Sequence, residues 1–440
     1  MKNHSGNPQA VAAAGRLILE RVLADYHGPV AVRLWNGELA VGQTDAPCTV
    51  IFNQPSALRE LVLRRNVVRL AEDYLAEEVD IEGDVERLFD LVSYMRDLFL
   101  PWSTRLRVMR QAFRLPRLHH EKSAQQAIRA GRAERRNTKE SIGHHYDVGN
   151  DFYRLWLDRE MVYSCAYFSG VDQTLDGAQR DKLDYICRKL RLTPGQTLLD
   201  VGCGWGALVC WAARQYGVKA HGITLSEQQV VYARERIHKE GLQDQVTVEL
   251  RDYRDLPGDA RYDRVVSVGM FEHIGVANFP LYFGAIKRVL APGGLFLNHG
   301  ITDDTGWQDT PITRFINSYV FPDGELARIS KVTSAMENSG FEIIDVEGLR
   351  RHYALTLRCW VAALEANRAR AVDVVGEATY RVWRLYMAGS AYYFDEGSIN
   401  VFQVLAGHDR EPLTVGLRRD EMYEKGCECW PACSNDTREP

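Results

Sequence analysis

The chain has 440 residues, of which 45% are hydrophobic and 26% are charged, and its formal net charge is −5. This length allows two or more domains with separate cores, and the charge argues against nucleic-acid binding. No apolar run approaches the ~20 residues that span a bilayer, and the N-terminus lacks the apolar core of a signal peptide. The nonpolar neighbours of Cys187, Cys203 and Cys210 indicate buried, reduced thiols. We therefore expect a cytoplasmic protein; if it meets a membrane, it does so peripherally, from the inner face.

Residues 1–102 predict a small α/β domain. The segment PVAVRLWNGEL alternates like a strand and ends in an Asn36-Gly37 turn, while TVIFNQ and VDIEGD predict two further strands. Ser56 is a candidate N-cap for the first following helix and Asp84 for the next one.

Residues 103–140 predict a basic helical linker. Between Ser103 and Lys139 there are eleven basic and two acidic residues, and an apolar cluster from Leu98 to Trp102 comes just before them. An anionic membrane surface attracts such a segment by roughly 1 kcal/mol per Lys or Arg close to it. A solvated helix or linker without a ligand would have the same composition, so both interpretations stay open.

Residues 141–406 predict an α/β domain in which strands and helices alternate. This pattern is typical of a Rossmann-like, doubly wound, mostly parallel sheet with helices on both faces. Residues 407–440 are polar and predict a flexible tail. The tail contains Cys427, Cys429 and Cys433, but no fourth ligand has the spacing of a metal site, so we expect no metal.

A glycine-rich loop follows the first strand of this domain. The segment LLDVGCGWG places Asp200, Gly202, Gly204 and Gly206 between a strand and a helix. The D-x-G-x-G-x-G arrangement is typical of S-adenosylmethionine (SAM) enzymes, whereas dinucleotide-binding proteins have G-x-G-x-x-G. The sequence therefore predicts a SAM site.

The next two strands supply further candidates for this site. Many such folds have an acid at the end of the second strand, but GITLSEQQ offers the uncharged Thr224 and Gln229 for the ribose. After the third strand, Asp252 is a candidate for the adenine amino group and Tyr253 for stacking on the adenine. Asp252 would have no such role if it were only a surface loop acid.

Four segments resemble one family. They are HHYDVGNDFYRLWLDREMVYSCAYF, LLDVGCGWGAL, DRVVSVGMFEHIG and FPDGELA. Together they are similar, in this order, to the cyclopropane fatty-acid synthases, a family that includes the mycolic acid cyclopropane synthases. The likeness runs from about residue 140 to 406, and residues 1–102 resemble the lipid-associated domain of the bacterial phospholipid enzymes.

The resemblance implies an activity. A SAM-dependent C-methyltransferase of this family adds a methylene group to a cis double bond of an unsaturated phospholipid acyl chain. A carbocation intermediate then loses a proton to bound bicarbonate, and a cyclopropane ring forms. The family also implies a homodimer at a membrane surface.

The resemblance also implies roles for residues. Tyr163 and Ser164 would contact SAM, beside the residues of the loop and the two following strands. The ligands of bicarbonate would be Cys165, Glu272, His299, Ile301 and Tyr353.

Two residues bear on a covalent mechanism. Many family members have a cysteine where this chain has Ser390, so a covalent mechanism at that position is not expected. Cys165 has no basic neighbour in the sequence, so we interpret it as a wall of the anion pocket and not as a nucleophile.

Three alternatives stay open at this point. The same substrate could yield a methylene-branched or methyl-branched chain if a different proton leaves. Some plant enzymes of similar sequence are small-molecule N- or C-methyltransferases, and a non-catalytic lipid-binding protein is the third alternative. The sequence leaves the double-bond position, the head group and the oligomeric state undetermined.

Overall fold

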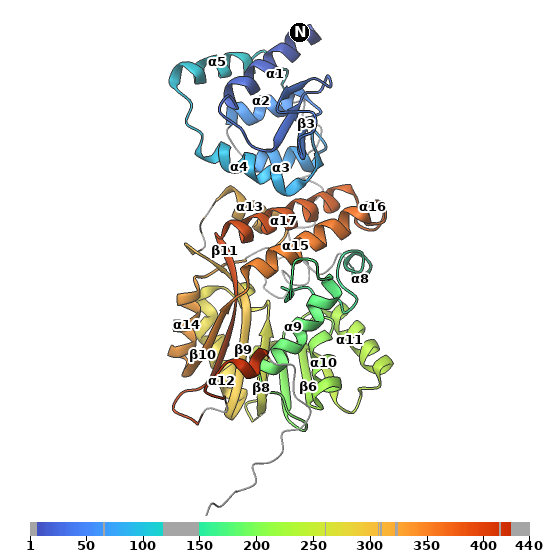
Figure 1. Cartoon of the computed structure of the whole chain (residues 1–440), viewed down its shortest axis with the longest axis vertical. Helices are drawn as coiled ribbons and strands as arrows, with labels where there is room; N and C mark the ends of the chain where they lie inside the picture. The colour runs from blue at the N-terminus through green and yellow to red at the C-terminus, as the bar shows by residue number, and fades with distance from the viewer. Residues whose placement is uncertain are drawn as a thin grey trace, which may run out of the picture.

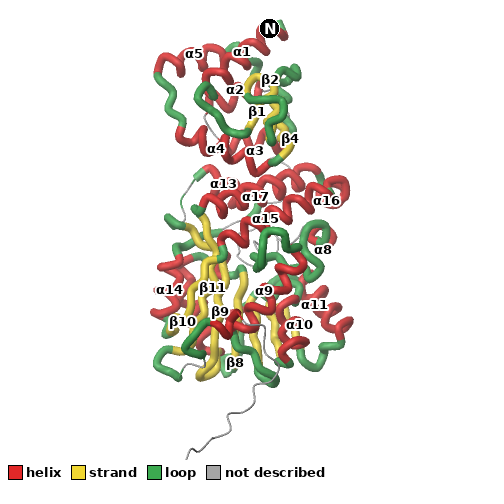
Figure 2. The backbone as a smooth tube through the Cα atoms, viewed as in Figure 1, coloured by secondary structure: helices red, strands yellow, loops and turns green. Residues whose placement is uncertain are grey.

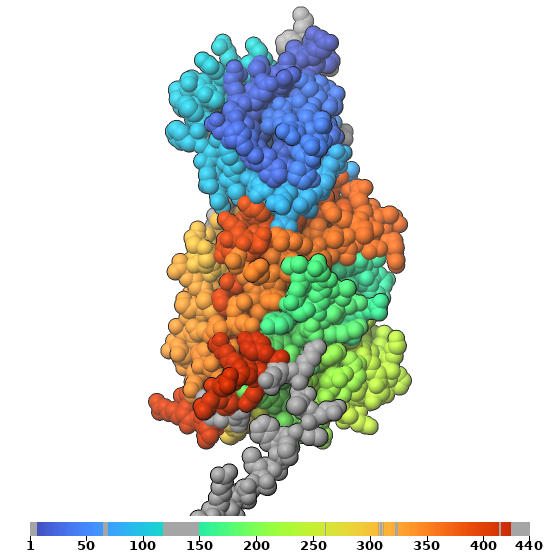
Figure 3. Space-filling model, in the orientation of Figure 1, coloured from blue at the N-terminus to red at the C-terminus, as the bar shows by residue number. Residues whose placement is uncertain are grey.

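The computed structural model describes residues 7–64, 67–117, 149–259, 261–306, 308, 310–321, 324–412 and 415–423. Most of the predicted basic linker, the start of the first family motif and the three cysteines of the predicted tail lie outside these residues. The described chain forms an N-terminal unit (7–117) and a C-terminal unit (149–423) (Figure 1). The N-terminal unit, blue in Figure 3, rests on helices near the end of the chain, which are orange.

The N-terminal unit is built on a four-stranded sheet with the strand order β2-β1-β3-β4. Its strands are β1 (Val30–Arg33), β2 (Leu39–Val41), β3 (Cys48–Phe52) and β4 (Val79–Gly83). Its helices are α1 (Pro8–Val22), α2 (Pro55–Arg64), α3 (Val67–Leu75), η1 (Val85–Arg87), α4 (Leu88–Asp97) and α5 (Trp102–Ala112). The predicted strands are confirmed, and the turn between β1 and β2 has Gly37 at a φ of 84°.

The two predicted helix caps have different outcomes. Asp84 is confirmed, because its carboxylate accepts a hydrogen bond of 3.0 Å from the backbone N–H of Glu86. The prediction for Ser56 is wrong, because α2 begins one residue earlier, at Pro55. Proline suits the first turn of a helix, where its missing N–H has no intrahelical partner.

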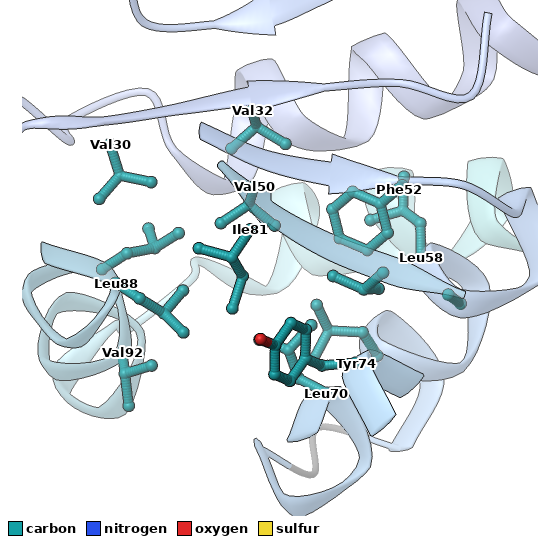
Figure 4. Close-up of a cluster of buried hydrophobic side chains, with 14 of the residues drawn as sticks. Val30, Val32, Val50, Phe52, Leu58, Leu70, Tyr74, Ile81, Leu88 and Val92 are labelled. Carbon is teal, nitrogen blue, oxygen red and sulfur yellow. The ribbon is translucent and has the colours of Figure 1, made fainter. Parts of the chain in front are cut away.

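The core of the N-terminal unit lies between its sheet and its helices (Figure 4). Val50 and Ile81 point from neighbouring strands toward the space between α4, which carries Leu88, and α3, which carries Tyr74. All four side chains are buried. The same core also contains side chains from the C-terminal unit, so the two units share one hydrophobic cluster.

The C-terminal unit is built on a seven-stranded sheet with the order β10-β11-β9-β8-β5-β6-β7. Its strands are β5 (Thr197–Val201), β6 (Lys219–Thr224), β7 (Val246–Leu250), β8 (Tyr262–Val268), β9 (Leu290–Asp303), β10 (Phe341–Gly348) and β11 (Ile399–His408). Strands β5 to β9 run parallel to one another, whereas β11 is antiparallel to both β9 and β10 at the edge of the sheet. Figure 2 shows this sheet as the yellow layer among red helices.

Helices cover both faces of this sheet. They are α8 (Asn150–Tyr153), α9 (Leu175–Lys189), α10 (Ala207–Tyr216), α11 (Glu227–Glu240), η2 (Tyr253–Asp255), η3 (Phe271–His273), η4 (Val276–Asn278), α12 (Phe279–Val289), α13 (Pro311–Tyr319), α14 (Ile329–Asn338), α15 (Arg350–Ala366), α16 (Arg368–Val375), α17 (Glu377–Glu396) and α18 (Asp420–Tyr423). Leu198 of β5 packs in a cluster with α9, α10 and α11, while the next residue, Leu199, packs in a cluster with α12 and α14. The predicted doubly wound sheet is confirmed.

Two buried arginines of α17 connect the C-terminal unit to the N-terminal unit. The guanidinium of Arg384 donates to the hydroxyl of Tyr74 and to the carbonyl oxygens of Ile81 and Gly83, each at 3.2 Å. The guanidinium of Arg381 donates to the carbonyl oxygen of Tyr74 at 3.0 Å. Because these donors satisfy backbone acceptors of the N-terminal unit, they fix its position on α17.

Residues after β11 pack against the C-terminal unit. Met422 of α18 is buried, and its carbonyl oxygen accepts a hydrogen bond from Arg188 of α9 at 2.5 Å. Tyr423 stacks on Tyr185 of the same helix with ring centroids 5.8 Å apart. Residues 415–423, which the sequence assigned to a polar tail, are therefore part of the packed structure; residues 424–440 lie outside the described chain.

We expect Arg384→Ala to lower the free energy of unfolding by about 3 kcal/mol, because it leaves buried acceptors and the Glu365 carboxylate without a donor. Denaturant titration measures this loss. The matched control is Arg368→Ala, which removes an exposed ion pair with Glu377 and should cost less than about 1 kcal/mol. Equal losses in the two variants would contradict a structural role for Arg384.

Candidate active site

The glycine loop after β5 borders a cavity of about 150 Å³. Gly202 has a φ of 89°, a left-handed conformation that side chains disfavour, and the loop turns there into α10. The predicted cofactor residues that line this cavity are Tyr163, Ser164, Asp200, Gly202, Gly204, Thr224, Gln229 and Tyr253. The structure thus brings together residues from β5, β6, the segment before α9 and the loop after β7.

Two predicted cofactor residues do not line this cavity. Gly206 precedes α10, and a Cβ atom at this position would lie 3.1 Å from the Cβ of Ala233 in α11. Asp252 is buried, and its carboxylate accepts two hydrogen bonds from the guanidinium of Arg254, at 2.9 and 2.6 Å. The cofactor contacts predicted for Asp252 and Gly206 therefore stay predictions, and Gly206 in addition allows the close approach of α11.

Buried polar groups on the cavity wall suit a polar cofactor. Burial raises the pKa of Asp200 to about 7, and its Oδ1 atom has no hydrogen-bond partner among the described residues. Thr224 donates a hydrogen bond of 2.6 Å to the side-chain oxygen of Gln229. An acceptor without a protein donor beside a cavity fits a ligand with N–H or O–H groups, and SAM carries both.

Lys182 of α9 also lines this cavity. Its ammonium donates to the Ser164 hydroxyl at 2.9 Å, and burial lowers its pKa to about 8, against the opposing effect of Asp158. A lysine within a helix has no local pattern that marks it as part of a site, so the sequence reasoning missed it. The contact holds Ser164 in place between the two cavities of this unit.

A second, larger cavity of about 470 Å³ adjoins the first. Tyr163 and Ser164 line both cavities and so form part of their common wall. All five predicted catalytic residues line the larger cavity: Cys165, Glu272, His299, Ile301 and Tyr353. Most of its other lining residues are apolar.

Glu272 lies directly after β8, in η3, where its side chain is only 5% exposed. Its Oε1 atom accepts a hydrogen bond of 3.5 Å from the backbone N–H of Ile301, while Oε2 has no partner among the described residues. Burial raises its pKa to about 7. Gly300 leaves room for this carboxylate, because a Cβ atom there would lie 2.7 Å from Oε2.

His299 lies within β9, toward its carboxyl end, and is buried beside the same cavity. Burial lowers its pKa to about 3, so the imidazole is neutral at pH 7. Its Nδ1 atom lies 3.2 Å from the amide nitrogen of Gln403, and if this amide donates, Nε2 carries the proton. Nε2 has no partner in the described chain. A donor on His299 and an unpartnered carboxyl oxygen on Glu272 suit a small oxyanion that can donate one proton, such as bicarbonate.

The thiol of Cys165 is buried and protonated. Its Sγ atom lies 3.3 Å from the carbonyl oxygen of Ala166 and 3.8 Å from that of Leu349, and burial raises its pKa. Lys182 favours the thiolate, but this effect is the smaller one. A thiol in this state is a poor nucleophile. Among the described cysteines none forms a disulfide, and Cys187, Cys203 and Cys210 are buried thiols as expected.

Sequence reasoning also missed two residues of the larger cavity. His273 lines both cavities, and its ring centroid lies 5.1 Å from that of Phe321. Tyr386 of α17 lines the larger cavity near Tyr163. His273 could have been found from its position beside Glu272, whereas Tyr386 reaches the site only through the packing of α17. The described residues contain no cluster of potential metal ligands.

The sheet topology, the glycine loop and the cavity at the carboxyl ends of β5, β6 and β8 define the class of SAM-dependent methyltransferases. The sequence profile described as "Mycolic acid cyclopropane synthetase" matches residues 133–404, and one described as a domain of unknown function matches residues 18–103. The chain therefore belongs to the mycolic acid cyclopropane synthetase family, and the resemblance found in the sequence is confirmed.

Relatives agree with this assignment. A Pseudomonas putida protein named "Probable fatty acid methyltransferase" is 41% identical over 419 residues, which cover 92% of this chain and 99% of that protein. The cyclopropane-fatty-acyl-phospholipid synthase of Escherichia coli is 40% identical over 261 residues, covering 59% of this chain and 66% of that protein. A solved mycolic acid cyclopropane synthase complexed with SAH and CTAB is 36% identical, with a TM-score of 0.58, and covers 62% of this chain and 99% of that one.

The buried carboxyl of Glu272 predicts a pH-dependent stability. Its folded-state pKa of about 7 is above the usual 4.5, so the stability it contributes is present below pH 4.5 and is lost as the pH rises through 7. At 1.36 kcal/mol per pKa unit, the loss is about 3 kcal/mol. Glu272→Gln should abolish this component, so its free energy of unfolding, measured at pH 5 and pH 8, should fall less than that of the wild type. Parallel pH profiles would exclude a raised pKa.

Proposed function

We propose that the chain transfers a methylene group from SAM to a cis double bond of an unsaturated phospholipid acyl chain and forms a cyclopropane ring. We further propose that a carbocation intermediate loses its proton to bound bicarbonate. The observation that carries this proposal is the shared wall of the two cavities. Tyr163 and Ser164 lie between a smaller cavity, whose buried Asp200 and Gln229 suit SAM, and a larger, mostly apolar cavity that contains Glu272 and His299.

The cofactor supplies an electrophilic methyl group, and the chain supplies the environment for the reaction. The alkene is a weak nucleophile, so the site must exclude groups that would trap a cation. The protonated thiol of Cys165 meets this requirement. The ring of Tyr163 lies in an aromatic cluster, with ring centroids 5.2 Å from Trp360 and 5.5 Å from Trp156. Aromatic faces attract a cation by ~0.5–2 kcal/mol each.

Glu272 and His299 are proposed to assist removal of the proton, Glu272 by accepting it and His299 by orienting the bound anion. A group with a pKa of about 7 can accept or return a proton near neutral pH, and Glu272 has this pKa. The neutral imidazole of His299 would orient a bound bicarbonate through Nε2–H, and Tyr353 would contact the anion from α15. Lys182 adds a nearby positive charge that favours an anion in this region.

The relatives support a lipid substrate. The names of the Pseudomonas putida and Escherichia coli proteins refer to fatty acids and to fatty-acyl phospholipids. The name of the first is also compatible with a second candidate function, in which the product is a methylene-branched or methyl-branched chain. The same residues would serve both outcomes, which differ only in the proton that leaves.

We also propose that α5 and the residues before it contact an anionic membrane surface. Phe99 is 88% exposed, Trp102 70% and Phe113 62%, and Arg105 lies over the ring of Trp102 at 5.8 Å. Arg96 lines the larger cavity. Phe99 follows Arg96 closely in the sequence, so the proposed docking surface begins only a few residues after a residue of the cavity. Within the described chain, no helix is long and apolar enough to cross a membrane. The homodimer implied by the family stays a prediction, which sedimentation can check.

The activity is tested by incubating the protein with SAM and vesicles of mono-unsaturated phospholipid, followed by NMR of the extracted lipid. We expect cyclopropane protons; an exocyclic methylene or a methyl branch would favour the second candidate. Glu272→Gln should lower turnover at least about a hundredfold, the usual contribution of a positioned proton acceptor, and leave SAM affinity nearly unchanged. Cys165→Ser should retain most activity, because no covalent role is proposed for the thiol. Wild-type turnover in Glu272→Gln would remove that residue from the mechanism.

Membrane docking is tested by co-sedimentation with anionic vesicles. The double substitution Phe99→Ser and Trp102→Ser removes two exposed aromatic rings, so binding should weaken by at least about tenfold. The control is Val171→Ser, which changes a residue that is 73% exposed on the C-terminal unit and should leave binding unchanged. Equal binding of the double variant and the wild type would show that α5 is not the docking surface.

A further inference from the structure

The larger cavity extends from the proposed reaction centre into the N-terminal unit. Beyond α17, it is lined by side chains from β3, α3, β4 and α4, including Val50, Leu70, Ile81, Phe89 and Val92. Each of these residues is at most 9% exposed, so the cavity enters the core of this unit and ends there. Figure 4 shows Val50 and Ile81 facing the space between the helices that carry Leu70 and Val92.

The polar groups of this cavity are distributed unevenly. The end inside the N-terminal unit presents apolar side chains and Tyr74, whose hydroxyl is already engaged by Arg384. The solvent-exposed lining residues are polar, and they include Arg96, Asp304 and Gln308. The cavity therefore has a polar, exposed part where the two units meet and an apolar, closed end inside the N-terminal unit.

We propose that this closed end holds the methyl-terminal part of the reacting acyl chain, and that the N-terminal unit thereby selects the chain length beyond the double bond. The inference rests on the proposed function. A phospholipid has its polar groups at the carboxyl end of each acyl chain, so only the methyl end can enter an apolar space without burying an unpaired polar group. The closed end is also continuous with the cavity that contains Glu272.

Comparison with the solved relative indicates that the proposed length selection depends on residues that this chain has and the relative lacks. That mycolic acid cyclopropane synthase is matched over 99% of its own length but covers only 62% of this chain. It therefore has no counterpart for most of the remaining residues, and the N-terminal unit adds a wall that the shorter enzyme does not have. The length limit proposed here belongs to the N-terminal unit.

The test changes the depth of the closed end in both directions. Leu70→Ala enlarges it and Ala71→Leu fills it, because both residues line the cavity. Leu58→Ala is the matched control, since Leu58 is 1% exposed in the same core and does not line the cavity. The substrates are phospholipid vesicles that share one double-bond position and differ only in the number of carbons beyond it. Competing substrates in one vesicle give product ratios by mass spectrometry.

We expect Leu70→Ala to favour longer chains and Ala71→Leu shorter ones, by at least about fivefold, because a chain too long for the closed end costs about 1 kcal/mol or more in overpacking. Leu58→Ala should keep the wild-type ratios even if its thermal midpoint falls. Unchanged ratios in both lining variants, or an equal change in Leu58→Ala, would overturn the inference. The inference would also be overturned if the product ratios depended on the length of the saturated acyl chain of the same phospholipid. If the wild type modifies no acyl chain at all, the proposed function itself fails, which is a separate result.

Discussion

Burial of the carboxyl edge of the seven-stranded sheet controls the chemistry of this protein. Asp200 of β5, Glu272 after β8 and His299 of β9 are all buried, so water is largely excluded from these polar groups. Asp200 and Glu272 consequently have raised pKa values, and the pKa of His299 is lowered. Each of these groups tends toward its neutral form at pH 7. The absence of a free carboxylate or thiolate nucleophile at Glu272 and Cys165 suits the cationic intermediate that we propose, because such a group would trap the cation.

The same burial explains why the N-terminal unit matters to the active site. Helix α17 contributes Tyr386 to the larger cavity. The same helix contacts the N-terminal unit through Arg381 and Arg384, which donate hydrogen bonds to backbone oxygens there. A buried guanidinium without acceptors is costly, so α17 and the N-terminal unit stabilise one another. The position of α17 in the cavity wall therefore depends on the contact between the two units.

Local patterns predicted much of the fold and the candidate site. The alternation of strands and helices, the glycine loop and the Asp84 cap depend on residues near one another in the sequence, and the structure has all three. Glu272 and His299 could be predicted because Glu272 follows a strand of the parallel sheet and His299 lies toward the carboxyl end of another. Residues brought in by distant helices, such as Lys182 and Tyr386, carry no local pattern. The cavity lining from the N-terminal unit could not be predicted either, because its apolar residues have the sequence pattern of ordinary core positions.

Gly300 shows how little space surrounds the carboxylate of Glu272. It lies between His299 and Ile301, and a methyl group there would come within 2.1 Å of the Phe271 ring and 2.7 Å of the Glu272 carboxylate. No single substitution at this position can leave both neighbours in place. A lineage or a mutant library that replaces Gly300 must therefore also make room at positions 271 and 272, so viable variants at 300 require at least one further change.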